Sequence, residues 1–361
     1  MNDRLYPYLV DPKETPAIWG GDALVRRYGK RGDPAARIGE SWECWDDNRV
    51  VNGALTGRTV GELRTELGAE LTGPIDPARP FPVLTKIIDA HAPLSVQVHP
   101  DDAYAQRVEH QPNGKTECWY VLACDSGAEI VLGWSRDTSR DEVAQRVADG
   151  TLAEIMRRVP VAPGSVYYLP AGTVHAIGAG IQLFETQQTS DLTYRLFDWN
   201  RVGDDGKPRE LHVAKALDVL DYRAATAGAL RSLTFDEPGL RRTLLIADRN
   251  FAVERIDVTG GETSLETGGL PLTITTLGSH LRVDASPIGG SAVIEPWSTV
   301  VTPAACERLA LFPGGEPTAA LVVHPRPRLD ALRHSAQAAG RPAAELDGFA
   351  AQFAEPKKGE R

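Results

Sequence analysis

The residues best suited to chemistry in this sequence are a glutamine, two histidines and a glutamate in its first half. Gln97 and His99 are two residues apart, so on a β-strand their side chains project from the same face. Glu117 follows after a loop, and His175 follows the turn-forming segment 170–172, which would direct its imidazole inward from the next strand. An amide oxygen, two imidazoles and a carboxylate suit Zn²⁺, and would also accept Mn²⁺, Co²⁺ or Fe²⁺. We therefore expect one divalent ion per chain, in an open site of the catalytic type.

Short strands joined by turns are the elements that must position these residues. The 34 Gly and 26 Pro are spread along the chain, a distribution typical of such strands. Residues 81–99 predict two apolar strands separated at Pro93. Helical periodicity and start signals predict three helices, at residues 59–71, at 140–159 with a break at Asp149-Gly150, and at 210–220.

The second half of the chain also has the pattern of strands and turns. Apolar and polar residues alternate most clearly at 251–258, 272–276 and 319–324, between Gly and Pro residues. This half repeats the character of residues 94–199 without their His and Glu residues, which predicts a second β-barrel without chemistry of its own. Residues 326 onward are rich in Ala, Arg and Lys, and we expect residues 356–361 to be disordered.

Composition and charge exclude several classes of function. Apolar residues make up 42% and charged residues 24% of the 361 residues, as in ordinary globular proteins of two or three domains. The net charge of -10, with no basic stripe, argues against nucleic-acid binding. With no apolar run of about 18 residues and a charged, proline-broken N-terminus, we expect a cytoplasmic protein without a membrane segment. The four cysteines lack paired spacing, so we expect free thiols: Cys44, Cys118, Cys124 and Cys306.

The segment around His175 resembles one of the two motifs that mark cupin barrels. Pro163-Gly164 is followed, after five residues, by Pro170-x-Gly172-x-x-His175. The other motif usually contains His-x-His and a later Glu, whereas this chain has Gln97-Val98-His99 and a longer gap before Glu117. The resemblance implies a mainly β fold with added helices: two cupin (jelly-roll) barrels, the first metal-binding and the second degenerate, plus a small helical segment.

The domain boundaries expected from this interpretation are set by where the strand patterns begin and end. The catalytic cupin domain would span residues 1–230, with N-terminal strands and a helical insertion at about 136–160. The second barrel would span 231–325, followed by a tail at 326–361 that is partly helical or disordered.

A longer set of motifs is similar to type I mannose-6-phosphate isomerases, and in particular to their compact bacterial members. The resemblance covers nearly the whole chain to about residue 325. The matching runs, in order, are Trp19-Gly20-Gly21, residues 38–43, 94–102, 114–117, 170–176, 185–201 and 209–212.

The resemblance implies an enzyme that interconverts mannose 6-phosphate and fructose 6-phosphate at a zinc-dependent site, with Gln97, His99, Glu117 and His175 as metal ligands. By the same motifs the catalytic arginine of the family falls on Arg195 and its active-site lysine on Lys115. A pocket carboxylate falls on Glu185, and Ser95 occupies a position that lines the substrate pocket.

Isomerisation through an enediol needs a base with a near-neutral pKa and a cation to stabilise the developing negative charge. Glu185 is the first candidate for the base. Lys115 would instead transfer the hydroxyl proton or bind phosphate, and the sequence leaves both roles open. Arg195 adds a positive charge that cannot deprotonate.

Phosphate binding requires cations, and four of them lie close together in the sequence: Arg195, Arg201, Lys207 and Arg209. The competing interpretations are a solvated loop for Lys207 and Arg209, and a structural ion pair with Asp191 or Asp198 for Arg195. Four aromatic residues alternate with the ligand segments, and we interpret them as core rather than sugar-stacking residues: Trp119, Tyr120, Tyr167 and Tyr168.

Three alternative functions remain open. Two histidines and a carboxylate also form the facial triad of an iron-dependent cupin oxygenase, although Gln97 and the cations after Arg195 count against it. A non-catalytic sugar-binding cupin would not need Lys115, Glu117 or Arg195. An isomerase of another aldose, phosphorylated or free, would keep the same chemistry. For each of the isomerases the partner is a small molecule, and we expect a monomer or weak homo-oligomer.

Overall fold

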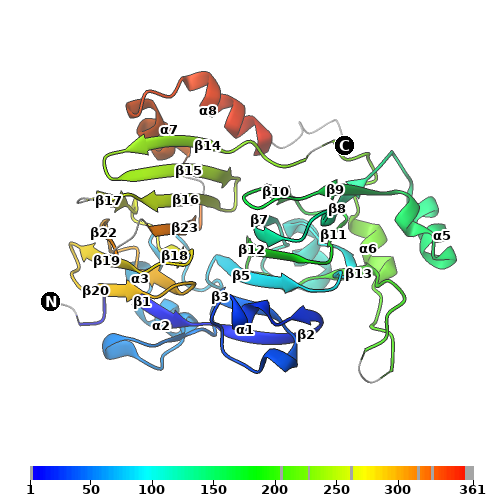
Figure 1. Ribbon diagram of the computed structural model, residues 1–361, viewed down its shortest axis with the longest axis horizontal. Coiled ribbons are helices and arrows are strands. Elements are labelled where there is room, and N and C mark those ends of the chain that lie inside the picture. The colour runs from blue at the N-terminus through cyan, green and yellow to red at the C-terminus, as the bar shows by residue number, and fades with distance from the viewer. Residues whose placement is uncertain are drawn as a thin grey trace. The chain divides into compact units, whose positions relative to one another are not determined.

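The computed structural model describes residues 3–203, 206–226, 228–260, 263–314, 318–326 and 329–353, and strands predominate in it (Figure 1). The prediction of a mainly β protein with added helices is confirmed. The chain divides into two compact units. The first, called here the site unit, consists of Glu14–Trp42 and Thr85–Ala229. The remaining described residues form the second unit.

The site unit contains two antiparallel sheets. One has six strands in the order β10-β7-β12-β5-β3-β2, and the other has five in the order β13-β6-β11-β8-β9. A core of apolar side chains from both sheets, among them Trp119, Leu183 and Ile130, lies between them, as in a β-sandwich. In order along the sheets, the strands are β10 Val166–Leu169, β7 Glu117–Cys124, β12 Ile181–Gln188, β5 Val83–Ala90, β3 Ile38–Cys44 and β2 Lys13–Gly21, then β13 Tyr194–Phe197, β6 Val96–Val98, β11 His175–Ile177, β8 Glu129–Trp134 and β9 Met156–Pro160.

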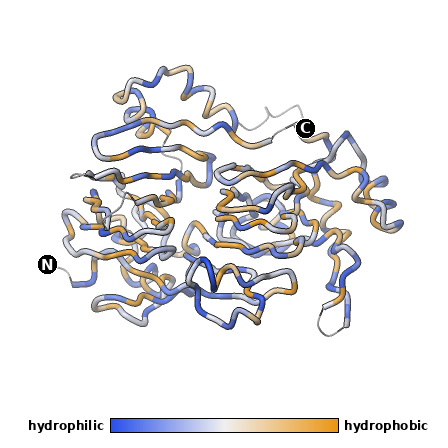
Figure 2. The backbone as a smooth tube through the Cα atoms, in the orientation of Figure 1, coloured by the Kyte–Doolittle hydropathy of each residue, from blue (hydrophilic) through white to orange (hydrophobic). Residues whose placement is uncertain are grey.

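The longer helices of the site unit pack against the five-stranded sheet. Val143 of α5 (Arg140–Asp149) and Leu217 of α6 (Val213–Val219) share a buried cluster with Val98 of β6. The helix α5 is largely hydrophilic elsewhere, whereas hydrophobic stretches follow the strands (Figure 2). The shorter helical elements are α1 Ala23–Arg26, a 3-10 turn Pro34–Ala36, α4 Asp102–Tyr104, a π-helical turn Ala105–Glu109 and a 3-10 turn Leu152–Glu154.

The predicted helix at 140–159 is correct only in its first piece. The α5 helix ends where expected, because Gly150 adopts the left-handed conformation (φ 71°) that terminates helices. The predicted second piece is wrong, since β9 begins at Met156 and pairs with β8, with Val159 opposite Ile130. Strand pairing satisfies the backbone there while Met156 and Val159 are buried. The two strands predicted in 81–99 are confirmed as β5 and β6, and the helix predicted at 210–220 contains α6.

The second unit has the same type of construction, with a buried core between two sheets. One sheet has the order β14-β15-β16-β23-β18-β21-β1-β4 and the other β17-β22-β19-β20. The strands predicted at 251–258, 272–276 and 319–324 are confirmed as β16, β18 and β23. The strands are β14 Leu233–Glu237, β15 Leu240–Ala247, β16 Ala252–Val258, β23 Thr318–His324, β18 Leu272–Thr276, β21 Thr299–Thr302, β1 Tyr8–Asp11 and β4 Arg49–Val50, then β17 Thr263–Glu266, β22 Arg308–Pro313, β19 Leu281–Ser286 and β20 Ser291–Ile294.

The N-terminal strands do not group as the sequence suggested. We expected residues 1–230 to form one domain, but β1 pairs with β21, with Tyr8 opposite Val301, and β4 pairs with β1. The division at residue 230 does match the start of the C-terminal segment of the second unit. Strand pairing between such distant segments leaves no periodic signal in the sequence.

The helices of the second unit follow the predictions closely. The helix expected at 59–71 is split by Gly68 (φ 54°), and its expected apolar face at Leu63, Leu67 and Leu71 is buried. The tail is helical, as expected in part, and packs against β14. The predicted disorder at 356–361 lies outside the described residues. The helical elements are a 3-10 turn Gly53–Leu55, α2 Val60–Leu67, α3 Ala69–Thr72, α7 Leu329–Ala338, α8 Ala343–Ala350 and a 3-10 turn Ala351–Phe353.

Two further predictions concern cysteines and membranes. All four cysteines are free thiols, as expected, with Cys124 half-buried and the other three buried. Among the described helices, none has the length and apolar character required to cross a bilayer.

Candidate active site

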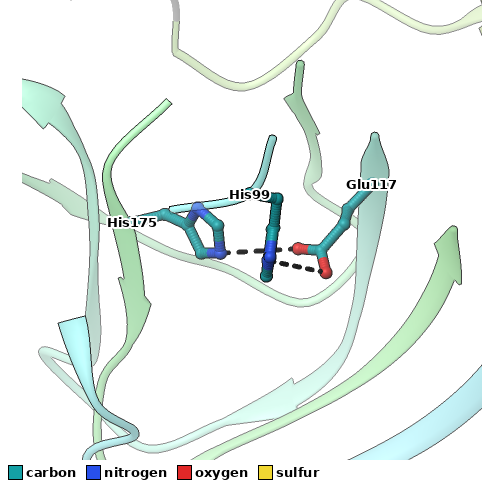
Figure 3. Close-up of side chains that lie close together, drawn as sticks. All are labelled: His99, Glu117 and His175. Atoms are coloured by element: carbon teal, nitrogen blue, oxygen red, sulfur yellow. Dashed lines mark ion pairs between the residues drawn. The ribbon is translucent and has the colours of Figure 1, made fainter. Parts of the chain in front are cut away.

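Three of the predicted metal ligands meet at one point in the site unit (Figure 3). His99 directly follows β6, Glu117 is the first residue of β7, and His175 is the first residue of β11. The Nε2 atoms of His99 and His175 lie 3.2 and 3.5 Å from the two oxygens of Glu117. All three residues are at most 2% exposed. The sequence prediction that these side chains converge is therefore confirmed.

The protonation states at this cluster fit a divalent metal. Nδ1 of His99 and of His175 each lies 2.8 Å from a backbone carbonyl, of Leu192 and Thr173 respectively. A carbonyl only accepts, so Nδ1 carries the proton and Nε2 presents a lone pair to the centre. Burial lowers the pKa of His99 and lowers that of His175 to about 3, so both imidazoles are neutral.

The carboxylate of Glu117 is the third donor group of the cluster, and some donor atoms of the cluster have no hydrogen-bond partner within the described chain. Burial alone would raise the pKa of Glu117, but Lys115 and His99 hold it well below its usual range. Oε2 of Glu117 and Nε2 of His99 are buried without a hydrogen-bond partner among the described residues, whereas Oε1 of Glu117 lies against Nζ of Lys115. Such orphaned atoms are costly unless a cation is bound, so the residues present fit a metal ion.

Gln97 lies beside this cluster. It is opposite His175 in the pairing of β6 with β11, and its Nε2 atom lies 3.3 Å from Nε2 of His175. Rotating the amide by 180° would bring its oxygen to the same place with almost no change in shape. The side chain of Gln97, the fourth predicted ligand, is thus in contact with one member of the cluster.

A pocket of about 320 Å³ opens next to the cluster within the site unit. Arg201 and Lys207, which were predicted to bind substrate, are not part of its lining, and Lys207 is exposed. The predicted residues that do line it are Ser95, Gln97, Lys115, Glu185, Arg195 and Arg209.

Glu185 is a buried carboxylate in the middle of β12. Its Oε2 accepts a hydrogen bond of 2.8 Å from Nε1 of Trp119, and its Oε1 lies 3.7 Å from Nζ of Lys86. Burial, reinforced by the charge of Glu117, raises the pKa of Glu185 to about 7. At neutral pH this carboxyl can both accept and return a proton.

Lys115 is a buried cation between two carboxylates. It forms an ion pair with Glu117. Burial alone would lower its pKa, but Glu117 and Glu185 outweigh burial and raise it. Lys115 is therefore protonated at neutral pH and can donate a hydrogen bond.

Arg195, on β13, does not form the structural ion pair with Asp191 or Asp198 that was the competing interpretation of its sequence. Its Nε donates to Oγ of Ser95 (3.3 Å) and its Nη1 to the carbonyl of Glu210 (2.8 Å). In the described parts of the chain it has no carboxylate partner within ion-pair distance. Asp198 instead binds two other arginines, Arg201 at 2.6 Å and Arg209 at 2.7 Å.

Sequence reasoning missed a second charged pair in the pocket. Lys86 of β5 is 5% exposed, and its Nζ lies 3.4 Å from Oε2 of Glu40. The same Nζ lies over the ring of Trp42. Trp42 donates a 2.6 Å hydrogen bond to Glu40. A signal was present, because a lysine in the middle of the apolar strand Val83–Ala90 is unusual unless it has a buried partner.

The aromatic residues interpreted as core are mostly buried: Trp119, Tyr120 and Tyr167 are, while Tyr168 is half-buried. Trp119 is more than a core residue, since its indole N–H reaches the pocket carboxylate Glu185.

These features define a mainly β protein with a buried site of the metal-binding type beside a charged pocket. Residues 10–120 match the family model for the catalytic domain of phosphomannose isomerase type I. The chain belongs to the type I mannose-6-phosphate isomerase family and is an enzyme of that family, as its motifs predicted.

The similarity extends over most of the chain. It is 38% identical over 282 residues to mannose-6-phosphate isomerase of Streptococcus mutans, covering 77% of this chain and 86% of the relative. It is 44% identical over 219 residues to mannose-6-phosphate isomerase ManA of Bacillus subtilis, covering 60% and 68%. The crystal structure of mannose 6-phosphate isomerase from Bacillus subtilis matches with a TM-score of 0.80 and 31% identity, over 88% of this chain and 99% of that one.

Proposed function

We propose that this protein interconverts mannose 6-phosphate and fructose 6-phosphate through an enediol, with a bound divalent metal. The observation that carries the proposal is Glu185, a buried carboxylate with a raised pKa, beside the cation Lys115 and the cluster around Glu117. Relatives named mannose-6-phosphate isomerase support the choice of substrate.

Gln97, His99, Glu117 and His175 would hold the metal. Neutral imidazoles with oxygen donors favour Zn²⁺, with Mn²⁺, Co²⁺ and Fe²⁺ as alternatives, and one ion per chain. A divalent ion bound there would polarise the carbonyl and the adjacent hydroxyl of the sugar.

Two side chains would transfer protons: Glu185 on β12 and Lys115 in the segment before β7. Glu185 would remove the proton from C2 of the aldose and return it to C1, which requires a base near neutral pKa. Lys115 would donate to the oxygen that becomes negative. Arg195 lines the same pocket and adds a fixed positive charge.

Of the four cations predicted to bind phosphate, only two are in a position to contact a substrate in the pocket. Arg195 and Arg209 line the pocket, and Ser95 is held there by the Nε of Arg195. Arg201 would act indirectly, because it binds the same Asp198 that orients Arg209. For Lys207 the position outside the pocket lining favours the solvated-loop interpretation.

An Arg195→Ala variant tests this proposal directly. We expect metal-loaded wild-type protein to convert mannose 6-phosphate but not free mannose. Losing one fixed charge at the pocket should lower kcat/KM about 10²–10³-fold, as removal of a preorganised donor does. The measurement is a coupled assay of both sugars after reconstitution with Zn²⁺.

The same assay separates the alternatives. If metal-loaded wild type turns over no aldose phosphate, the isomerase proposal fails. Turnover of a different aldose phosphate would change the substrate and keep the chemistry. Oxygen uptake with bound iron and no sugar turnover would favour an oxygenase.

A Trp119→Phe variant should shift the pH dependence of the reaction. The indole N–H stabilises the ionised form of Glu185. Its loss should raise the pKa of Glu185 further, by about one unit. Because the base must be deprotonated, kcat/KM rises with pH through this pKa, so the acidic limb should move to higher pH.

The control is Trp134→Phe, which removes an equally buried indole N–H whose partner, the carbonyl of Asp221, lies outside the pocket lining. Profiles of kcat/KM from about pH 5 to 9 compare the two. An unshifted limb in Trp119→Phe would mean that Glu185 is not the group that titrates.

Further features of the family resemblance remain proposals. The stacked sheets of each unit support two jelly-roll barrels of the cupin type, with the second lacking a metal site. A cytoplasmic location and a monomeric or weakly homo-oligomeric state are expectations from the sequence.

A further inference from the structure

Two adjacent glutamines, Gln187 and Gln188, end the strand β12 that carries Glu185. They are 0% and 8% exposed, and neither lines the pocket. Buried amides need partners for both donor and acceptor atoms. The partners of Nε2 of Gln187 and of both amide atoms of Gln188 lie in or beside the two short segments that carry Lys115 and the carbonyl bound to His99, whereas Oε1 of Gln187 is buried without a hydrogen-bond partner among the described residues.

Gln188 holds the segment around Lys115 from both sides. Its side-chain Oε1 accepts a hydrogen bond of 3.0 Å from the backbone N–H of Thr116. The backbone N–H of Gln188 in turn donates to the carbonyl of Thr116 at 3.1 Å. Its Nε2 donates to Oδ1 of Asp102 at 3.1 Å, and that oxygen also accepts the N–H of Gly114 at 2.9 Å. The side-chain amide of Gln188 thus holds Thr116 directly, and it holds Gly114 through Asp102.

Gln187 holds the turn that follows β12. Its Nε2 donates to two backbone carbonyls of this turn, that of the next residue at 3.1 Å and that of Ser190 at 2.8 Å. Two residues beyond Ser190, the carbonyl of Leu192 accepts the Nδ1–H of His99 at 2.8 Å. The orientation of His99 therefore depends on a turn that Gln187 closes.

We propose that Gln187 and Gln188 are positioning residues, Gln187 for the imidazole of His99 and Gln188 for Lys115 and the adjoining Glu117. A neutral amide suits the place of Gln188, because it accepts from Thr116 and donates to Asp102 without adding charge beside a lysine, and Gln187 acts through its donor alone. Partners of this kind typically affect metal affinity or activity 10–100-fold. The catalytic part of the inference rests on the proposed function, while the part on metal binding does not.

The experiment compares Gln187→Met and Gln188→Met, which keep side-chain length and remove the amide. Gln182→Met is the matched control, since Gln182 is on the same strand but bonds Asp89 rather than a ligand segment. Zinc affinity is measured by competition with a chromophoric chelator, and kcat and KM with mannose 6-phosphate. We expect Gln187→Met to bind zinc about 10–100-fold more weakly. Gln188→Met should lower kcat about 10-fold or more with a much smaller change in KM.

A second pair of variants distinguishes positioning from a loss of packing. Gln188→Glu opposes a second carboxylate to Asp102 and should lower kcat. Adding Asp102→Asn to Gln188→Glu should restore part of the lost kcat. The amide N–H of the substituted residue 102 can donate to the new carboxylate at position 188, while its oxygen still accepts from the N–H of Gly114. If either Met variant fails to fold, the comparison of Gln188→Glu with and without Asp102→Asn still tests whether Gln188 positions Lys115.

The inference is overturned if both Met variants keep wild-type zinc affinity and kcat, or if Asp102→Asn does not improve Gln188→Glu. Zinc affinity does not require turnover. If wild type fails to isomerise any sugar but Gln187→Met still binds zinc weakly, the proposed function is wrong and the positioning role of Gln187 stands.

Discussion

A His175→Ala variant is expected to lose its metal and, with it, all measurable isomerase activity. His175 is at the start of β11, with its Nδ1–H fixed by the carbonyl of Thr173 and its Nε2 3.5 Å from Glu117. Changes outside the ligand shell typically cost 10–100-fold in metal affinity, so removing a ligand should cost at least about 100-fold. The measurement is zinc content per chain after loading and desalting, together with zinc affinity by competition.

His91→Ala is the matched control, because His91 is exposed and outside the cluster. It should retain about one zinc per chain, as a single site of this type holds one ion. Circular dichroism of both variants checks that the overall strand content of the protein is retained. Unchanged zinc content in His175→Ala would remove this residue from the ligand set.

The core of this site could be predicted because local rules determine it. The alternation of a strand places Gln97 and His99 on one face, and the turn at 170–172 directs His175 inward. Both rules act over a few residues, so they can be applied without knowing the fold. The cluster of His99, Glu117 and His175 confirms the inward direction of His175.

The second charged pair could not be predicted in this way. Lys86 meets Glu40 because their strands, β5 and β3, are neighbours in the six-stranded sheet. Periodicity shows which face of a strand is buried, but it does not say which strands are neighbours or in what register. The pairing of β1 with β21 was missed for the same reason.

The wrong helix at 151–159 has a different cause. A short segment containing Met156 and Val159 has apolar spacing compatible with either a helix or an edge strand. Tertiary pairing with β8 decides between the two, and the intrinsic preference of so few residues is too weak to resist it.

A buried carboxylate, Glu185, and a half-buried one, Glu40, line the pocket, and their surroundings shift their pKa values in opposite directions. Burial raises the pKa of Glu185 to about 7, with a further contribution from Glu117. For Glu40 burial is outweighed by Lys86 and by the hydrogen bond from Trp42, so its pKa is lowered. A general base must be able to exchange a proton near neutral pH, which Glu185 can do and Glu40 cannot.

Glu185→Gln should therefore lower kcat about 10²–10⁴-fold, the usual contribution of general acid–base catalysis, while zinc content stays unchanged. The substituted amide has the same size, and its oxygen can still accept from Nε1 of Trp119, so the pocket should keep its shape. Exchange of the C2 hydrogen of mannose 6-phosphate with deuterated solvent should stop, which reports the proton transfer itself. Glu40→Gln serves as the comparison: it alters the partner of Lys86, so binding should weaken while exchange continues. If exchange stops in Glu40→Gln and persists in Glu185→Gln, the assignment of the base is reversed, because only the residue that carries the proton controls its exchange.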